Sequence, residues 1–325
     1  MDQPLVSIII PAYNGEEYIA ETIDSCFCQT YPRLEVIVVD DGSTDETRKI
    51  IEPLINSGKI RYVYQKNQGP SVARNAGIRL AAGKYIQFLD ADDLLLPEKI
   101  QKQVECLEAA PKSNLCACDF RCFDGSEAAA LCGGDLFKGE FPLHSAGQLF
   151  DFETVIHRWL FPASLLRDFG LFAENLRTGE DWFLLWKFAA RGTGFIYLDE
   201  PLALYRKHRR NTTNDFDRVA AGHLLAIGRV DRYQEQHGLS LYSKRDLDQL
   251  RDSYHYELGL YQARSNNLRR AWHNFFKALL LSRHRRQRKL LLILAMPLGG
   301  QRAIDLTRSA NDHLWRWRAR LRRIV

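Results

Sequence analysis

The chain has 325 residues, enough for one large domain or two domains of ordinary size. Hydrophobic residues make up 46% of the sequence and charged residues 26%, so the chain can bury a core and wholesale disorder is excluded. The net charge of +5 is unevenly distributed: residues 241–325 hold 19 Lys and Arg against 6 Asp and Glu, whereas residues 1–240 hold 26 against 34. A basic C-terminal part predicts an anionic partner such as a membrane surface, a nucleic acid or an acidic protein.

The sequence shows no secretory signal. Its first apolar run, Leu5–Ile10, is short, follows Asp2 and lacks a basic segment before it. The longest later run, Leu290–Leu298, falls well short of the roughly 20 residues that a spanning helix needs. We therefore expect a cytoplasmic protein, or one held peripherally on the inner face of the cell membrane. The seven cysteines are then expected to be reduced thiols.

The first hundred residues alternate between strand and helix patterns. Continuous apolar runs are typical of strands buried on both faces, and segments with helical spacing separate them. Asn14 is positioned to cap the first helix, and Ser43 with Glu46 has the spacing of a capping box at the second. This alternation predicts an α/β fold with a mostly parallel sheet and helices on both faces. The expected strands are residues 6–10, 36–39, 60–64 and 85–89, and a helix is expected over 70–82.

The second half of the chain is less regular. Residues 110–175 show no clear pattern, but a helix is expected from Thr178 or Gly179, followed by a short strand at Phe195–Leu198. From about Asp217 onward the pattern is helical. The residues that indicate one buried face of the helix after Gly179 are Trp182, Leu185, Trp186 and Ala189.

Polar residues follow three of the expected strands. Pro11–Asn14 follows the first, Asp40, Asp41 and Ser43 the second, and Asp90–Asp93 the fourth. Ligands of such sheets bind outside the carboxyl ends of the strands. Carboxylates gathered there need hydrogen bonds or a cation, and an Asp-x-Asp pair suits Mg²⁺ or Mn²⁺ carried with substrate phosphates. The alternative is an acidic turn that caps the next helix.

Four segments together resemble the family 2 glycosyltransferases of GT-A fold, of the type that builds bacterial cell-surface polysaccharides. They are residues 6–14, 38–45, 69–77 and 88–93, in the family's order and spacing. The resemblance is strong over residues 5–100 and weaker to about residue 213. It implies a doubly wound mixed sheet with helices on both faces. It also implies a catalytic domain over 1–215, with a nucleotide-sugar half (about 1–100) and an acceptor half (about 100–215), before a basic helical region over 216–325.

The same resemblance implies a nucleotide-diphosphate-sugar donor, with uridine diphosphate as the expected nucleotide, and Mn²⁺ or Mg²⁺ as cofactor. Asp92 is expected to be the direct metal ligand, with contributions from Asp90 and His208 and an assisting role for Asp93. Asp41 is the expected contact of the nucleotide base. The residues implied to bind the donor are Pro11, Tyr13, Asp40, Asp41, Ser43, Arg74, Asp90, Ala91 and Arg206.

The resemblance also implies a catalytic base after Gly179. An acidic pair opens a helix there, and we expect Asp181 to be the general base and Glu180 a supporting or acceptor contact. A carboxylate can serve because an oxocarbenium-like transition state requires only late removal of the acceptor proton. The alternative is that both carboxylates merely stabilise the helix dipole. Likewise, the segment Tyr205–His208 resembles a loop that closes over the diphosphate, with a basic surface loop as the alternative.

Cysteine and tryptophan clusters admit less specific roles. Cys116, Cys118, Cys122 and Cys132 lack the paired spacing of zinc sites, which favours free thiols. Trp159, Trp182 and Trp186 could stack on sugars, but core packing is the expected role. Spacings between Leu258 and Ala278 weakly resemble one tetratricopeptide hairpin, which would need a surface to pack on.

The C-terminal part interleaves basic residues with Leu and Trp, in residues 283–298 and 314–323. This pattern suits an interfacial helix on anionic lipid. Packing on the acidic first half is the alternative, and nucleic-acid binding is not expected because no recognition module accompanies the basic residues.

The sequence therefore predicts an inverting glycosyltransferase, with a hydroxyl of a lipid-linked or cell-surface glycan as its acceptor. A catalytically silent glycan- or nucleotide-binding scaffold of the same fold is the alternative. A nucleotidyltransferase of related fold is disfavoured because Pro11–Asn14 stands where a glycine-rich loop is expected. The absence of a Gly-x-Gly-x-x-Gly motif after Ile10 disfavours a dehydrogenase.

Overall fold

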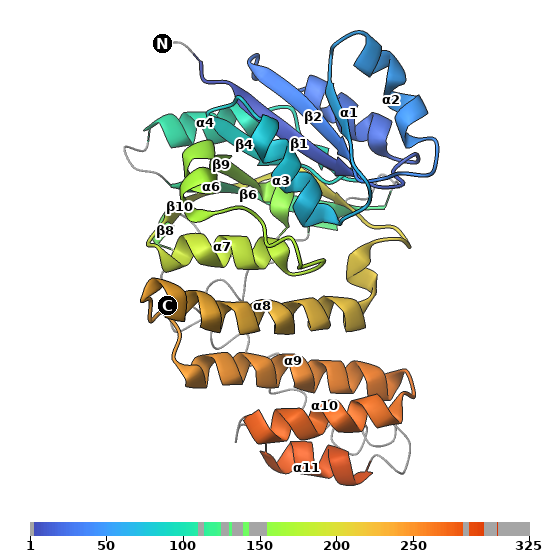
Figure 1. Cartoon of the computed structure of the whole chain (residues 1–325), viewed down its shortest axis with the longest axis vertical. Coiled ribbons are helices and arrows are strands. Elements are labelled where there is room, and N and C mark those ends of the chain that lie inside the picture. Colours follow the sequence, from blue (N-terminus) through green and yellow to red (C-terminus); the bar gives the residue numbers. More distant parts are fainter. Residues whose placement is uncertain are drawn as a thin grey trace. The chain divides into compact units, whose positions relative to one another are not determined.

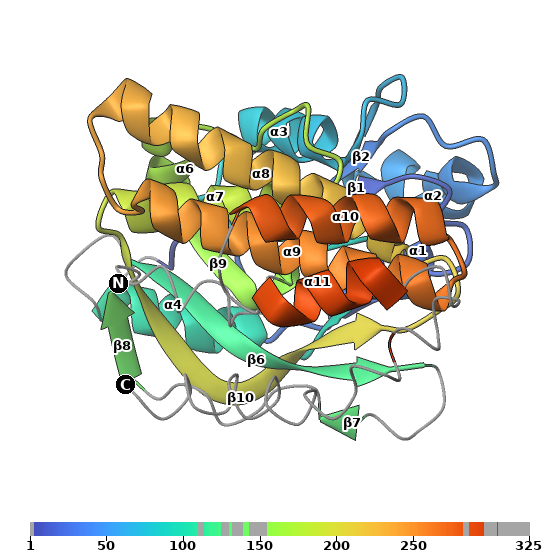
Figure 2. The same cartoon turned by 90° about the horizontal axis from the view of Figure 1, so that it is seen from below.

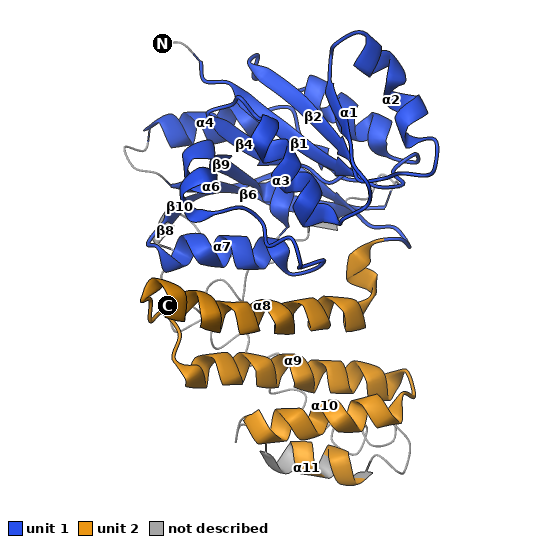
Figure 3. Ribbon diagram, in the orientation of Figure 1, with its two compact units in different colours: residues 1–210 blue, residues 211–325 orange. Residues whose placement is uncertain are grey.

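The computed structural model describes residues 3–109, 114–124, 130–131, 139–142, 155–281, 286–295 and 304. The chain divides into two compact units, residues 1–210 and residues 211–325, coloured separately in Figure 3.

The first unit is built on one mixed sheet (Figures 1 and 2), with strand order β3-β2-β1-β4-β9-β6-β10-β5. Strand β1 pairs in parallel with both β2 and β4, and β2 in parallel with β3. Strand β9 runs antiparallel to β4 and β6, and β6 is parallel to β10. The strands are β1 (Val6–Ala12), β2 (Leu34–Asp40), β3 (Arg61–Tyr64), β4 (Tyr85–Phe88), β5 (Leu94–Leu95), β6 (Leu115–Phe123), β7 (Ala130–Leu131), β8 (Gly139–Pro142), β9 (Trp159–Pro162) and β10 (Gly194–Arg206).

Helices cover both faces of this sheet, because alternate apolar residues of the inner strands point to opposite sides. Val36 and Val38 of β2 belong to one core with residues of α1 and α4, whereas Ile37 and Val39 pack with Ala73 of α3. The helices of this unit are α1 (Ile19–Phe27), α2 (Thr47–Asn56), α3 (Pro70–Leu80), α4 (Lys99–Ala109), α6 (Ala163–Phe169) and α7 (Glu180–Ala190), with a 3₁₀ turn at Ile156–Arg158.

The contact between α3 and the sheet requires a glycine. A Cβ on Gly77 would stand 2.3 Å from Cγ2 of Ile9, a separation that real Cβ atoms do not reach. Helix α3 can therefore approach β1 closely at this point, which places its N-terminal residues beside the strand ends.

Two helix-capping predictions were wrong. Asn14 has φ +51° and does not cap α1; its side-chain oxygen instead accepts a hydrogen bond from the Thr44 backbone N–H at 2.8 Å. Ser43 does not form a capping box, because its hydroxyl oxygen accepts from the Asn14 N–H at 3.0 Å, and Asp45 accepts from the N–H of Thr47 instead. These side chains tie the loops after β1 and β2 together, a long-range use that local spacing does not show.

Strand β10 is much longer than expected. It continues past Leu198 and through Pro201 to Arg206, with register shifts against β6 on both sides of Pro201. An irregularity accommodates proline, which has no N–H to donate to the ladder. The extension carries Arg206 to the segment that follows β4, where its backbone N–H donates to Asp93.

The second unit is helical, with a 3₁₀ turn at Thr212–Asn214 and helices α8 (Phe216–His237), α9 (Lys244–Arg264), α10 (Leu268–Leu281) and α11 (Arg286–Ala295). The hairpin expected between Leu258 and Ala278 is formed by α9 and α10. Their contact also depends on a glycine, since a Cβ on Gly259 would lie 2.7 Å from the ring of Phe275. No helix in the described ranges is long and apolar enough to cross a membrane.

Candidate active site

The carboxyl ends of β1, β2 and β4 meet at one edge of the sheet, because these strands are parallel neighbours. The acidic residues after β2 organise the loops there. Asp40 accepts from the Ser43 N–H at 2.8 Å and from the Tyr62 hydroxyl at 2.7 Å. Asp41 is buried and accepts from the backbone N–H groups of Gln68 (2.9 Å) and Gly69 (2.7 Å). Asp40 therefore fixes the turn after β2, and Asp41 fixes the segment that leads into α3.

Tyr13 and Pro11 lie at the same edge, at the end of β1. Tyr13 is 53% exposed, so its aromatic ring can stack on a flat ligand. Pro11 is half-buried within the strand. Exposed aromatic surface next to a polar loop is a suitable surface for a nucleobase.

The segment after β4 separates its three aspartates by environment. Asp90 is paired with Arg74 at 2.6 Å, and Asp92 lies 2.9 Å from Nε2 of His208. Asp93 is 1% exposed, lies 2.8 Å from Nδ1 of His157 and accepts from the Arg206 N–H at 2.8 Å. Asp93 thus anchors the segment, while Asp90 and Asp92 keep partly exposed carboxylates.

The environment of Asp92 suits a cation. Burial and the neighbouring carboxylates of Asp93 and Asp90 raise the pKa of Asp92 to about 6, although the bond to His208 opposes this shift. A divalent ion would relieve the repulsion between these carboxylates, and carboxylate oxygens are ligands that fit Mg²⁺ or Mn²⁺. In the part of the chain that the structure describes, no three acidic, His or Cys side chains are arranged so that they could together hold a metal ion. Substrate oxygens and water would therefore have to complete the coordination, as is usual for Mg²⁺.

Arg74 connects the two halves of the site. Its buried guanidinium binds Asp90 through one Nη atom at 2.6 Å and Glu180 through the other at 2.7 Å. Arg74 comes from α3, Asp90 from the end of β4, and Glu180 from the first turn of α7. The α7 N-terminus is thereby held at the same sheet edge as the aspartates.

Asp181 follows Glu180 in the first turn of α7, whose N-cap Gly179 has a left-handed backbone with φ +75°. Its Oδ1 accepts from the N–H of Trp182 at 2.7 Å. Burial, together with the nearby Glu180 carboxylate, raises the pKa of Asp181 to about 7, although Arg74 opposes the rise. A carboxylate with this pKa can take up a proton near neutral pH.

The resemblance implied that Arg206 binds the donor, but in the structure its guanidinium is taken up by contacts within the protein. Its side chain is buried, with the guanidinium 4.6 Å from the Tyr18 ring and 4.3 Å from the Phe123 ring. It donates to the Asp92 backbone oxygen at 2.8 Å and to the Glu21 carboxylate at 2.5 Å. These contacts make Arg206 a support for the segment that carries Asp92.

The sequence pattern did not reveal the buried His157 as the partner of Asp93, because no local signal links residues so far apart. Ala91, expected at the donor site, lies in the same segment, and its backbone oxygen accepts from the Thr22 hydroxyl at 3.0 Å.

Cysteine and tryptophan side chains lie mostly in the core. Cys116, Cys118 and Cys122 of β6 are buried and form no disulfide with the described residues, and Cys132 lies outside the described residues. Trp159 and Trp186 are fully buried, and Trp182 is 3% exposed, so core packing is confirmed for all three.

Comparisons with known proteins identify the family of this chain. The model of "Glycosyl transferase family 2" matches residues 7–168. An uncharacterized glycosyltransferase of Rickettsia prowazekii is 35% identical over 244 residues, covering 71% of this chain and 70% of the relative. Chondroitin synthase of Escherichia coli is 31% identical over 237 residues, but this chain spans only 32% of its length.

Solved structures show the same fold. Residues 1–349 of S. aureus TarS in complex with UDP-GlcNAc match with a TM-score of 0.66 and 19% identity, over 95% of this chain and 92% of that one. A mannosyltransferase of Pyrobaculum calidifontis in complex with GDP-Man and Mn²⁺ matches with a TM-score of 0.54 and 22% identity, over 71% and 65% of the two chains. With the family model and the relatives, these matches confirm that the chain belongs to glycosyltransferase family 2 and is a glycosyltransferase of GT-A fold.

Proposed function

We propose that this enzyme moves a sugar from a nucleotide-diphosphate donor to a hydroxyl of a lipid-linked or cell-surface glycan, with inversion at the anomeric carbon. Residues 1–215 would form the catalytic domain. The main support for the proposal is the two ion pairs that Arg74 forms with Asp90 and Glu180. They join the carboxylates suited to a metal with the N-terminus of the helix that bears Asp181.

The donor would bind along the carboxyl ends of β1, β2 and β4. The exposed ring of Tyr13 would stack on the base, with Pro11 beside it and the loops held by Asp40, Asp41 and Ser43 around the nucleoside. Ala91 lies in the segment that would face the ribose and sugar. The complex of TarS with UDP-GlcNAc supports a sugar nucleotide here, and a uridine nucleotide is the preferred donor.

Asp92, Asp90 and His208 would hold Mn²⁺ or Mg²⁺, whose charge would stabilise the departing diphosphate. The oxygen-rich, mutually repelling donor set described above supports this assignment, as does the Mn²⁺ in the mannosyltransferase complex. Arg206 would hold the segment that carries Asp92 in position, through its hydrogen bond to the Asp92 backbone oxygen.

Asp181 would act on the acceptor. As the acceptor oxygen forms its bond to the anomeric carbon, the bond from that carbon to the diphosphate oxygen breaks, and its electron pair leaves with the nucleotide. The acceptor proton passes to the Asp181 carboxylate. Because attack occurs on the face opposite the leaving group, a single displacement of this kind inverts the configuration. Glu180, neutralised by Arg74, would support the acceptor side.

We also propose peripheral association with an anionic membrane, on the cytoplasmic side. Leu290 and Leu294 of α11 are 40% and 74% exposed, and the basic sequence 283–288 precedes them in the chain; Lys289 itself is buried and paired with Asp252. The second basic segment, 314–323, lies outside the described residues. Sedimentation with vesicles containing phosphatidylglycerol tests this: binding should weaken in Leu290→Ser/Leu294→Ser, and unchanged binding would refute it.

The decisive experiment screens a panel of sugar nucleotides for Mn²⁺-dependent release of nucleoside diphosphate. The substitution Asp92→Asn should abolish release, whereas Asp168→Asn, an equal change at an exposed position of α6, should leave it intact. A donor turned over equally well by Asp92→Asn would contradict the metal assignment, and a panel without any turnover would contradict the proposed reaction.

A further inference from the structure

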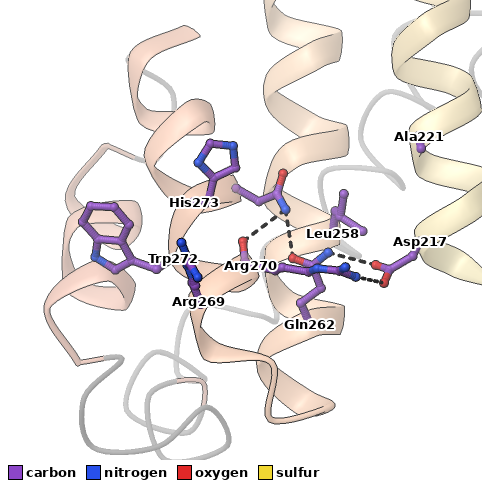
Figure 4. Close-up of a pocket in the computed structure, with 9 residues that line it drawn as sticks. Asp217, Ala221, Leu258, Gln262, Arg269, Arg270, Trp272 and His273 are labelled. Carbon is purple, nitrogen blue, oxygen red and sulfur yellow. Dashed lines mark hydrogen bonds and ion pairs between the residues drawn. The ribbon is translucent and has the colours of Figure 1, made fainter.

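The helical unit contains a cavity of about 610 Å³ that the proposed reaction does not use (Figure 4). Helices α8, α9 and α10 each contribute to it, so the cavity lies within this unit. Its volume is within the usual range of small-molecule and saccharide sites. The polar, charged and aromatic residues that line it include Asp217, Gln262, Arg269, Arg270, Trp272 and Asn274.

The wall of the cavity contains a chain of buried polar side chains. Asn274 is 7% exposed and donates to Gln262 at 2.8 Å, while its own oxygen lies 2.8 Å from Nδ1 of His255. Gln262 is 5% exposed and donates to Asp217 at 2.9 Å. Burying two side-chain amides between packed helices costs free energy unless their donors and acceptors form hydrogen bonds. Here the hydrogen bonds fix the orientation of the Asn274 and Gln262 amides, and they hold the Asp217 carboxylate at the cavity (Figure 4).

The charge of the cavity favours an anion. Helix α10 carries Arg269, Arg270 and Lys277 and has no acidic residue. Arg270 lies 3.8 Å from Asp217, which is the single acid among the described residues that line the cavity. Arg269 makes no ion pair with the residues that the structure describes. Guanidinium groups bind carboxylates and phosphates through paired hydrogen bonds, so an anionic ligand would find a free partner here.

An aromatic ring borders the same cavity. Trp272 is 45% exposed and lies at the opposite end of the cavity from Asp217 (Figure 4). It stacks on Phe276 with ring centroids 5.5 Å apart and an interplanar angle of 5°, which leaves much of the pair open to solvent. Amphipathic aromatic rings of this kind provide apolar contact area for ligands that are otherwise polar.

We propose that this cavity binds an acidic saccharide, one that carries carboxylates or phosphates, as a second holding site for the acceptor glycan. Arg269 and Arg270 would bind the anionic groups, the Asp217 carboxylate would accept from sugar hydroxyls, and Trp272 would contact a pyranose face. The identification of the ligand as the acceptor rests on the proposed function, but the binding of an acidic saccharide does not.

The test measures affinity of the full chain for a chondroitin hexasaccharide by isothermal titration calorimetry, with maltohexaose as an uncharged probe. Arg269→Gln/Arg270→Gln should weaken binding of the acidic probe about tenfold or more, because two charge-assisted contacts are lost. Lys277→Gln is the matched control, since it removes a charge from the same helix outside the cavity. Trp272→Ala should weaken binding several-fold, and Asp168→Asn, at an exposed position of α6, should leave the affinity unchanged.

Equal weakening per removed charge in the double variant and in Lys277→Gln would overturn the proposal, because it would indicate a diffuse charge effect. Equal affinity for maltohexaose would also overturn it. Binding to phosphatidylglycerol vesicles without binding to the hexasaccharide would assign α10 to the membrane instead. Loss of hexasaccharide binding with intact turnover of sugar nucleotides would refute this inference alone, whereas intact binding without turnover would refute only the proposed reaction.

Discussion

The substitution Asp181→Asn tests the assignment of the general base through two independent properties. Asparagine retains the oxygen that accepts from the Trp182 N–H, so the first turn of α7 keeps its hydrogen bond. It cannot take up the acceptor proton. We therefore expect kcat to fall about 10²–10⁴-fold, the usual contribution of general base catalysis.

The same substitution should change stability in a pH-dependent manner. The pKa of Asp181 is raised from 3.8 to about 7, so the folded protein disfavours the ionised carboxylate that the unfolded chain tolerates. The penalty is absent below pH 4, grows between pH 4 and 7, and is complete above pH 7. Three pKa units correspond to an upper bound of about 4 kcal/mol, and partial exposure of this side chain reduces the expected gain for Asp181→Asn to about 1–2 kcal/mol at pH 8.

Urea denaturation at pH 4 and pH 8 measures this difference, and steady-state release of nucleoside diphosphate measures kcat. Asp168→Asn serves as control, because Asp168 is exposed and should show neither effect. A variant with full activity would refute the role of Asp181 as base. An equal gain in stability at both pH values would refute the electrostatic origin of its raised pKa.

Three further predictions concern the rest of the molecule. Arg74→Gln should lower the free energy of unfolding by about 3–5 kcal/mol in urea denaturation, because Asp90 and Glu180 lose their buried cation. Arg74→Lys should restore part of this stability. A loss below about 1 kcal/mol in Arg74→Gln would contradict a stabilising role for the two ion pairs. Mn²⁺ should raise the thermal midpoint of the wild-type chain but not of Asp92→Asn, and equal shifts would exclude this metal site. Gly259→Ala should destabilise the helical unit by about 1–3 kcal/mol through the clash with Phe275, whereas Gly228→Ala in α8, which meets open space, should stabilise it slightly, and the opposite order in thermal melts would contradict the packing described.

The order of strands and helices in the first hundred residues could be predicted because it depends on local periodicity. Continuous apolar runs give strands that are buried on both faces, and such strands pair in parallel. Parallel pairing of β1 with β2 and β4 then places Asp40, Asp41 and the Asp90 segment at one edge, as predicted. The end of β10 could not be foreseen, because the local effect of Pro201 is to interrupt a strand, and only pairing with β6 carries it further.

The roles of neighbouring acidic residues depended on tertiary contacts. Asp92 and Asp93 are adjacent and chemically identical. Asp93 is nevertheless buried against His157, whereas Asp92 remains partly exposed beside His208. Both partners lie far along the chain, so no local pattern distinguishes the two aspartates. The two capping errors at Asn14 and Ser43 have the same origin, since each side chain bonds to a different loop.

Residue type and short-range spacing are enough to predict the family, the sheet edge at which the acidic residues gather, and the chemistry available there. Long-range packing, by contrast, pairs Arg74 with Asp90 and with Glu180, which lies 106 positions from Arg74 in the chain, and it places Arg206 against the backbone oxygen of Asp92. It also brought three helices around the polar cavity of the second unit. The physical reason is that a buried charge takes its partner from whichever element packs against it, and sequence spacing does not record that packing.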